Sequence, residues 1–166
     1  MKTAQLFKRL ALSKRSASKG FTLIELLVVI GILAVLLAIT LIAINPARQF
    51  SQANNTKRSS DVNAILNAVG QYAADNKGTL PTGIGASALT IQKSATPAND
   101  ADICADLVTK YMAALPVDPL TNNGTPITAC TSNYNTNYTI VKSASDSRIT
   151  VTAPAAELSQ TISVTR

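Results

Sequence analysis

The feature that most constrains this chain is an apolar run of 24 residues, 21–44. Only four of its residues are not clearly apolar: Thr22, Glu25, Gly31 and Thr40. As an α-helix the run would span about 36 Å, enough to cross a bilayer core of about 30 Å with some tilt. A cleaved secretory signal peptide has a shorter apolar core, of about 7–15 residues. A buried core helix would need more apolar surface than the rest of the chain provides. The run therefore predicts a membrane-spanning helix.

Charge is distributed unevenly about this run. Six basic residues and no acidic ones precede residue 21, whereas residues 21–166 contain nine basic and nine acidic side chains. The net charge of +6 therefore belongs to the N-terminus, and overall charge gives no reason to expect nucleic acid as a partner. Basic residues tend to remain on the cytoplasmic side of a membrane. We expect a single-pass protein of the cytoplasmic membrane with its N-terminus in the cytoplasm and residues 45–166 outside.

The sequence divides into four segments. Residues 1–20 form a basic leader, and residues 21–44 form the membrane helix. Pro46 is the predicted helix break, because proline lacks a backbone N–H, and Asn45 can cap a new helix there. Residues 53–61 are polar on every face, so this stretch has little reason of its own to remain helical. Apolar residues then recur every three or four positions, which predicts an amphipathic helix continuing over residues 45–77. Gly78 is the candidate for its C-cap.

The fourth segment, residues 78–166, is predicted to be an exported globular region. Residues 79–101 are rich in proline, glycine and small residues, so we expect a loop with little regular structure. A short helix is expected around Ile103–Met112, ending before Pro116. Two strands, Tyr138–Ser143 and Arg148–Ala153, should form a hairpin, and Gln160–Thr165 can add a third. These elements predict an α+β fold.

Cys104 and Cys130 are the two cysteines of the chain, and neither belongs to a metal-binding cluster. In an exported region we expect them to be joined as a disulfide. Closing that loop would stabilise the fold by about 3–4 kcal/mol in the chain-entropy model. Two buried free thiols are the alternative.

The stretch KGFTLIELLVVIGILAVLLAI, residues 19–39, resembles the N-terminal signature of type IV pilins and of the pseudopilins of type II secretion. The resemblance implies that prepilin peptidase cuts between Gly20 and Phe21, that Phe21 is then N-methylated, and that Glu25 is the acid of the family's motif. It also implies a pilin-like fold, in which a long N-terminal helix packs on a small antiparallel sheet. Weaker similarity to major pseudopilins extends through residues 61–83.

Glu25 also needs a physical explanation. An anion near a helix N-terminus gains about 0.3–1 kcal/mol. An unpaired charge deep in hydrocarbon costs about 2.5–3.5 kcal/mol. A cationic partner is therefore expected once subunits leave the bilayer, and the Phe21 amine of a neighbouring subunit is the obvious candidate. A glutamate that only reaches the lipid headgroups is the alternative. Gly31, similarly, either permits close approach of helices or is incidental.

The sequence gives little support for an enzymatic function. The chain has no histidine, which excludes Ser-His-Asp, Cys-His and histidine-metal sites. Asp118, Asn122 and Asp146 offer oxygen ligands that could bind calcium, as similar loops do in major pseudopilins, but their spacing matches no EF-hand. A plain turn is the preferred interpretation. We expect no enzyme activity and no cofactor.

These observations predict a structural subunit of a homo-oligomeric type IV pilus or similar filament, found at the cell surface after assembly. Its expected partners are prepilin peptidase, an inner-membrane assembly platform and membrane lipid. A major pseudopilin of a type II secretion or DNA-uptake system is the close alternative. A monomeric, single-pass binding protein, in which Glu25 is accidental, is the more distant one.

Overall fold

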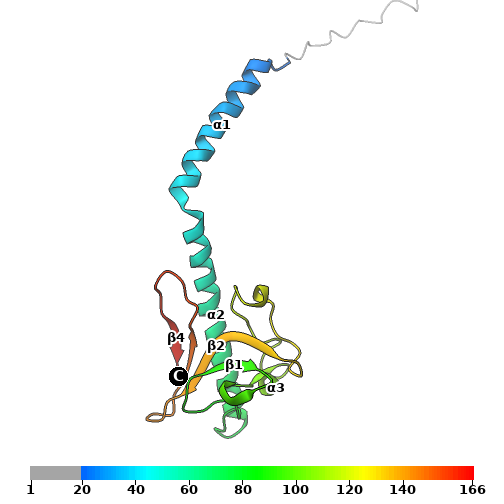
Figure 1. Ribbon diagram of the computed structural model, residues 1–166, viewed down its shortest axis with the longest axis vertical. Helices are drawn as coiled ribbons and strands as arrows, with labels where there is room; N and C mark the ends of the chain where they lie inside the picture. Colours follow the sequence, from blue (N-terminus) through cyan, green and yellow to red (C-terminus); the bar gives the residue numbers. More distant parts are fainter. Residues whose placement is uncertain (1–19) are drawn as a thin grey trace, which may run out of the picture. The chain divides into compact units, whose positions relative to one another are not determined.

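The computed structural model describes residues 20–166. The predicted leader, residues 1–20, therefore lies outside the described residues except for Gly20. The chain divides into two units, and the boundary falls between Ile44 and Asn45. We call the second unit, Asn45–Arg166, the headpiece (Figure 1).

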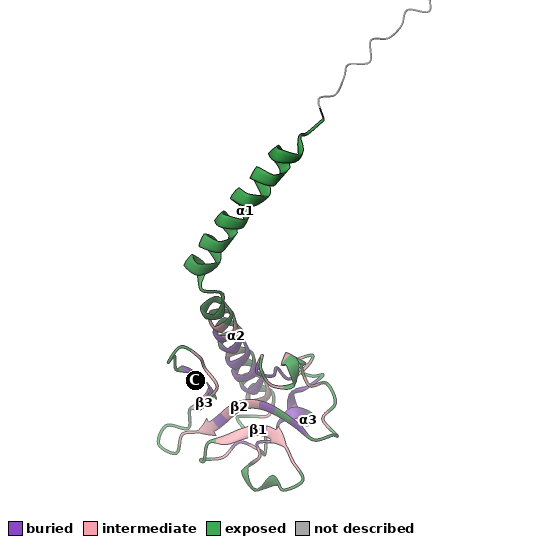
Figure 2. Cartoon of the chain, turned by 45° about the horizontal axis from the view of Figure 1, so that its top comes forward, coloured by how far each residue is buried: buried purple, intermediate pink, exposed green. Residues whose placement is uncertain are grey.

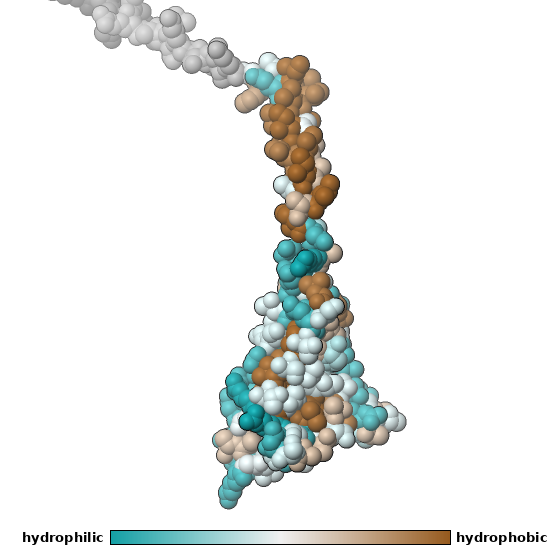
Figure 3. All heavy atoms as spheres, turned by 90° about the vertical axis from the view of Figure 1, so that its left-hand side faces the viewer, coloured by the Kyte–Doolittle hydropathy of each residue, from teal (hydrophilic) through white to brown (hydrophobic). Residues whose placement is uncertain are grey.

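The first unit is the helix α1, Leu23–Ile44. None of its 22 residues is buried, and Figure 2 shows it exposed along its whole length. Figure 3 shows that its surface is hydrophobic almost throughout. Within residues 20–166 it is the one helix whose length and composition suit a membrane span. An apolar surface of this kind needs lipid or other protein around it.

The headpiece begins with α2, Pro46–Asp75. Asn45 adopts a left-handed conformation, with φ 46°, and its side chain accepts a hydrogen bond from the Arg48 N–H at 3.3 Å. The structure thus has the helix break at Pro46 and the Asn45 cap that the sequence predicts. At the other end the C-cap is Asn76, two residues before the predicted Gly78, and its N–H donates to the Tyr72 carbonyl at 2.9 Å. Lys77 and Gly78 follow in left-handed conformations, and Gly78 donates to the Ala73 carbonyl at 2.7 Å.

Four antiparallel strands form the sheet: β1 (Leu89–Lys93), β2 (Tyr134–Lys142), β3 (Ile149–Ala153) and β4 (Ile162–Thr165). They lie in the order β1-β2-β3-β4, and α2 packs against the sheet chiefly through β3 and β4 (Figure 1). Buried side chains fill the space between helix and sheet, among them Val62, Ile65 and Val69 of α2 and Ile91, Ile140 and Val151 of the strands. The predicted α+β, pilin-like layout is confirmed.

Shorter elements connect β1 to β2: η1 (Pro97–Asn99), α3 (Cys104–Leu107) and η2 (Asn122–Gly124). Cys104 of α3 is joined to Cys130 by a disulfide with a Cα–Cα distance of 5.4 Å. The disulfide closes a sequence separation of 26 residues, so it braces the least regular part of the headpiece.

Three local predictions were wrong. Residues 79–101 are not all loop, because β1 pairs with β2 and buries Ile91 completely. The helix expected over residues 103–112 is a single turn, since Val108 is extended and Thr109 has φ 74°. Residues 53–61 are helical throughout, within α2. Side-chain contacts to other parts of the headpiece account for this last difference, and they are described below.

The hairpin is longer than predicted on one side. β2 begins at Tyr134 instead of Tyr138, whereas β3 and β4 fall within one or two residues of the expected positions. Tyr134, Thr136 and Tyr138 alternate inward with outward-facing Asn135 and Asn137, as a half-buried strand requires. The asparagines interrupt the hydrophobic pattern, and the prediction therefore placed the start of the strand too late.

Candidate processing and assembly site

Gly20 and Phe21 precede the first turn of α1 and belong to no regular element. Both are exposed, with Phe21 at 81% of its full accessible surface. Apart from its chain neighbours, no atom of the described residues lies within 4 Å of the place where a side chain on Gly20 would begin. Within the part of the chain that the structure describes, both residues flanking the predicted cleavage bond are thus exposed.

Thr22 and Glu25 form a reciprocal cap at the start of α1. The Thr22 hydroxyl accepts from the Glu25 N–H at 3.2 Å, and the Glu25 carboxylate accepts from the Thr22 N–H at 2.8 Å. The Thr22 hydroxyl also donates to the same carboxylate oxygen, at 2.8 Å. This is a capping box, in which a threonine at the N-cap and a glutamate three residues later satisfy each other's backbone N–H groups.

The capping box explains why a carboxylate is tolerated here, but it supplies only neutral hydrogen-bond donors. Of the side chains in α1, Glu25 alone is ionisable. Its negative charge is therefore solvated or faces the positive end of the helix dipole, with no cation from α1 beside it. The pattern T-x-x-E ahead of an apolar run could have been recognised in the sequence, and the sequence analysis overlooked it.

Comparison with known protein families bears directly on this segment. Residues 15–41 match the family model described as the prokaryotic N-terminal methylation motif. The chain carries a type IV prepilin signature. No curated protein and no solved structure matched the chain. The match confirms the resemblance found in residues 19–39, and it places the exposed Gly20–Phe21 bond and the Glu25 cap inside the prepilin motif.

A prepilin signature on an exposed apolar helix indicates a membrane-anchored precursor of the pilin or pseudopilin type. Such a motif is typical of a structural subunit that is processed by prepilin peptidase and assembled into a filament. Gly31 also lies within the matched residues, and nothing stands within 4 Å of the position its side chain would take. Its surface therefore leaves room for a second helix, although that room is no evidence of one.

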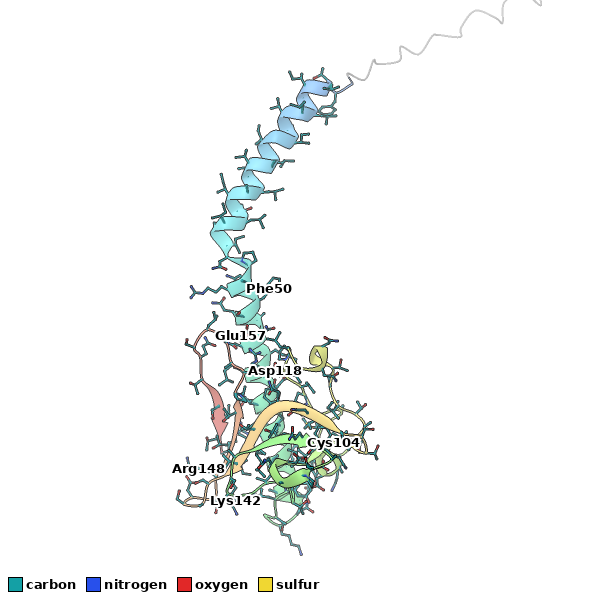
Figure 4. The ribbon with its side chains drawn as sticks, in the orientation of Figure 1. Phe50, Cys104, Asp118, Lys142, Arg148 and Glu157 are labelled. Carbon is teal, nitrogen blue, oxygen red and sulfur yellow. A yellow bond between two sulfur atoms is a disulfide. The ribbon has the colours of Figure 1, made fainter. Side chains whose placement is uncertain are left out.

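The calcium candidates do not converge. Asp118 is buried, and its two carboxylate oxygens accept from Arg58 Nε at 2.6 Å and from the Leu120 N–H at 2.9 Å. Asn122 is exposed on η2. Asp146 pairs instead with Arg148 at 3.5 Å in the β2–β3 turn. Figure 4 shows Arg148 well below Asp118. Within residues 20–166 there is no group of three or more acidic, cysteine or histidine side chains placed to bind a metal.

A buried ionic cluster is the feature that sequence reasoning missed. Arg58 of α2 has no exposed surface, yet it binds two acids that lie 60 and 99 residues away along the chain. Its Nε and Nη2 donate to Asp118, and its Nη1 donates to Glu157 at 2.8 Å and to the Asn55 side chain at 3.0 Å. In Figure 4 both acids lie beside α2, with Glu157 above Asp118. Arg58 therefore joins two loops to one helix.

The electrostatics of the cluster favour its charged form. The hydrogen bond with Asp118 raises the pKa of the Arg58 guanidinium. Arg58, followed by Asn54 and Ser51, holds the pKa of the Glu157 carboxyl below its ordinary value. Both shifts mean that the native fold stabilises the ion pairs over the neutral groups.

A third acid, Asp61 of α2 itself, lies one turn beyond Arg58. Asp61 accepts from the Tyr138 hydroxyl at 2.9 Å and also pairs with Lys57. Burial, followed by the bond to Asp61, raises the pKa of the Tyr138 hydroxyl, which therefore remains a proton donor. Together these contacts bury Asn55, Arg58 and Asp61 on one side of a stretch that looked polar on every face. The sequence shows the polar residues but not their partners, because every partner outside α2 is distant along the chain.

Proposed function

We propose that this chain is a filament subunit of the type IV pilin class, made as a precursor and cut between Gly20 and Phe21. Phe21 is then N-methylated, and the mature subunit waits in the cytoplasmic membrane with its N-terminus facing the cytoplasm. Assembly moves α1 out of lipid and into contact with the α1 helices of other copies. One observation supports the proposal most directly: a prepilin signature on a wholly exposed apolar helix whose one ionisable side chain lies in its first turn.

The role proposed for Glu25 follows from the capping box. Thr22 satisfies hydrogen bonds of the carboxylate but brings no positive charge. When α1 leaves the lipid headgroups for an apolar filament core, the charge needs a cation. Cleavage after Gly20 creates one, the amine of Phe21. Parallel helices packed with a short axial offset bring the amine of one copy to the carboxylate of the next.

Substitutions can separate the charge of Glu25 from its capping role. Glutamine also serves in a capping box, so Glu25→Gln keeps the helix start while it removes the charge. Thr22→Val does the reverse, since it removes the hydroxyl and keeps the charge. We expect Glu25→Gln to lower the ratio of filament to membrane-bound subunit severalfold, and Thr22→Val to leave that ratio near the wild-type value. Mass spectrometry must first show that all forms start at Phe21.

Two outcomes would contradict the proposal. A mature chain that still begins at Met1 would favour a monomeric, membrane-anchored binding protein. Wild-type filament yield from Glu25→Gln, with cleavage intact, would show that the carboxylate is only a cap. Electron microscopy of sheared cells then decides between a surface pilus and the shorter filament of a secretion or DNA-uptake system.

A further inference from the structure

The loop between β3 and β4, residues 154–161, lies along the first half of α2, and we call it the β3–β4 strap. None of its residues is fully buried. The Glu157 carboxylate accepts from three side chains of α2: Ser51 at 2.9 Å, Asn54 at 3.0 Å and Arg58 at 2.8 Å. Three hydrogen bonds from α2 thus end on one carboxylate of the strap.

Asn55 completes the attachment. Its side chain donates to the Glu157 carbonyl at 2.8 Å and to the Gln160 side chain at 2.9 Å, and it accepts from the Glu157 N–H at 2.9 Å. The four α2 residues that bind the strap, at positions 51, 54, 55 and 58, have the spacing of one helical face. The strap therefore lies on a continuous polar stripe.

The first half of α2 has little else to stabilise it. The first buried apolar side chain in α2 is Val62, so the helix from Pro46 to Asp61 lacks a hydrophobic contact with the core. Serine, asparagine and threonine, which are frequent here, are weak helix formers. Short isolated helices are marginal in water even with better sequences. The contacts that the headpiece makes with residues 51–58 of α2 are thus polar, whereas the continuation of the same helix from Val62 packs on the core.

The strap itself is strained next to its attachment point. Leu158 and Ser159 both adopt left-handed conformations, with φ 56° and φ 55°. This region is unfavourable for residues with a side chain, and it persists where the surrounding contacts enforce it. Leu158 is also 45% exposed, so burial does not compensate for the strain. Loss of the Glu157 carboxylate would leave Asn55 as the α2 side chain that still binds the strap, and these contacts would then have to hold the strained turn alone.

Because Arg58 has a second acidic partner, release of the strap would leave the buried guanidinium paired. Its Nε and Nη2 remain bound to Asp118 when Glu157 leaves, so no buried charge loses its last partner. We propose that the β3–β4 strap is a releasable clasp, and that Glu157 determines whether residues 46–57 of α2 stay helical. This conformational device does not depend on the proposed assembly function, because every residue in it belongs to the headpiece.

Hydrogen exchange on the full-length chain in detergent micelles tests the clasp. In Glu157→Ala, amides of residues 50–57 should exchange about tenfold faster, whereas those of residues 62–69 should keep wild-type protection. Glu157→Gln retains one acceptor oxygen and should show a smaller change in the same residues. Asp146→Ala is the matched control, because it removes an exposed acid whose ion-pair partner, Arg148, lies in the same turn, and it should change neither region.

The results that overturn the proposal are equally specific. Wild-type exchange in residues 50–57 of Glu157→Ala would show that this half of α2 is helical without the strap. Equal loss of protection in residues 50–57 and 62–69, or failure of Glu157→Ala and Glu157→Gln to fold, would show that Glu157 supports the whole core. Either result leaves the processing of Gly20–Phe21 and the role of Glu25 untouched.

Discussion

The two long helices of this protein reverse the usual relation between polarity and burial. α1 is apolar and wholly exposed, whereas the first half of α2 is polar and buries Asn55, Arg58 and Asp61. α1 therefore depends on what surrounds the molecule, because so apolar a surface needs lipid or other protein around it. α2 depends on contacts that the chain makes with itself. Hydrophobicity alone predicts the exposure of α1 to lipid, but it also predicts that the polar start of α2 is solvated, and there the burial of Arg58 contradicts it.

The largest effect should come from removing the buried cation of α2. Arg58→Met leaves Asp118, whose side chain is 1% exposed, without its charge partner. Breaking a buried pair on one side costs about 3–5 kcal/mol. All four tyrosines lie in the headpiece, so near-ultraviolet circular dichroism of the protein in micelles follows headpiece unfolding without a signal from α1. The unfolding midpoint should fall strongly.

A substitution in α1 serves as the comparison for Arg58→Met. Leu33→Ala removes an exposed apolar side chain and should leave the headpiece midpoint unchanged. The double variant Arg58→Met with Asp118→Leu removes both charges and should recover much of the loss. If Leu33→Ala destabilises the headpiece as much as Arg58→Met does, the two units are not independent in the way the comparison requires.

A somewhat smaller effect is expected from opening the disulfide. Cys130→Ser, paired with Cys104→Ser, should lower headpiece stability by about 3–4 kcal/mol, because the unfolded chain regains the entropy of a loop with a sequence separation of 26 residues. Far-ultraviolet circular dichroism should still report helix from α1 in micelles after the headpiece has melted. Alkylation without reductant should label neither cysteine of the wild-type chain. Loss of all helical signal in one transition would contradict this separation of the two units.

The smallest effect concerns pH, and it should be confined to the headpiece. The pKa of Glu157 is lowered in the folded protein by Arg58, Asn54 and Ser51. A carboxyl with a lowered folded pKa stabilises the fold above its ordinary pKa and loses that contribution as the pH falls through the folded value. Headpiece stability should therefore decline at acid pH, and less steeply in Glu157→Gln. An identical pH profile in the two proteins would show that the Arg58–Glu157 pair contributes nothing.

Much of the architecture was accessible from the sequence because it rests on short-range patterns. The length of the apolar run, the Asn45-Pro46 break and the hydrophobic spacing after Val62 are each visible within a few residues of chain. The same is true of the prepilin motif, in which basic residues are followed by a glycine and then by an apolar run that contains one acidic residue. The capping box of Thr22 and Glu25 was equally local, and the pattern that predicts it was present.

What could not be predicted depends on residues distant in sequence. Arg58 looks like any surface arginine until Asp118 and Glu157 are placed beside it. β1 was assigned to a loop because its five residues become a strand only when β2 lies alongside. Asp118 was considered as a calcium ligand because its sequence neighbours are turn residues, and its guanidinium partner is 60 residues away. In each case the deciding contact is tertiary.

The capping box at the start of α1 has a consequence for how a precursor could become a mature subunit. Its two side chains and both backbone N–H groups belong to Thr22 and Glu25, so they lie entirely downstream of the Gly20–Phe21 bond. A cut at that bond would leave each of these capping hydrogen bonds in place. Cleavage would therefore preserve the cap of α1 and add a new positive charge two residues before the helix begins.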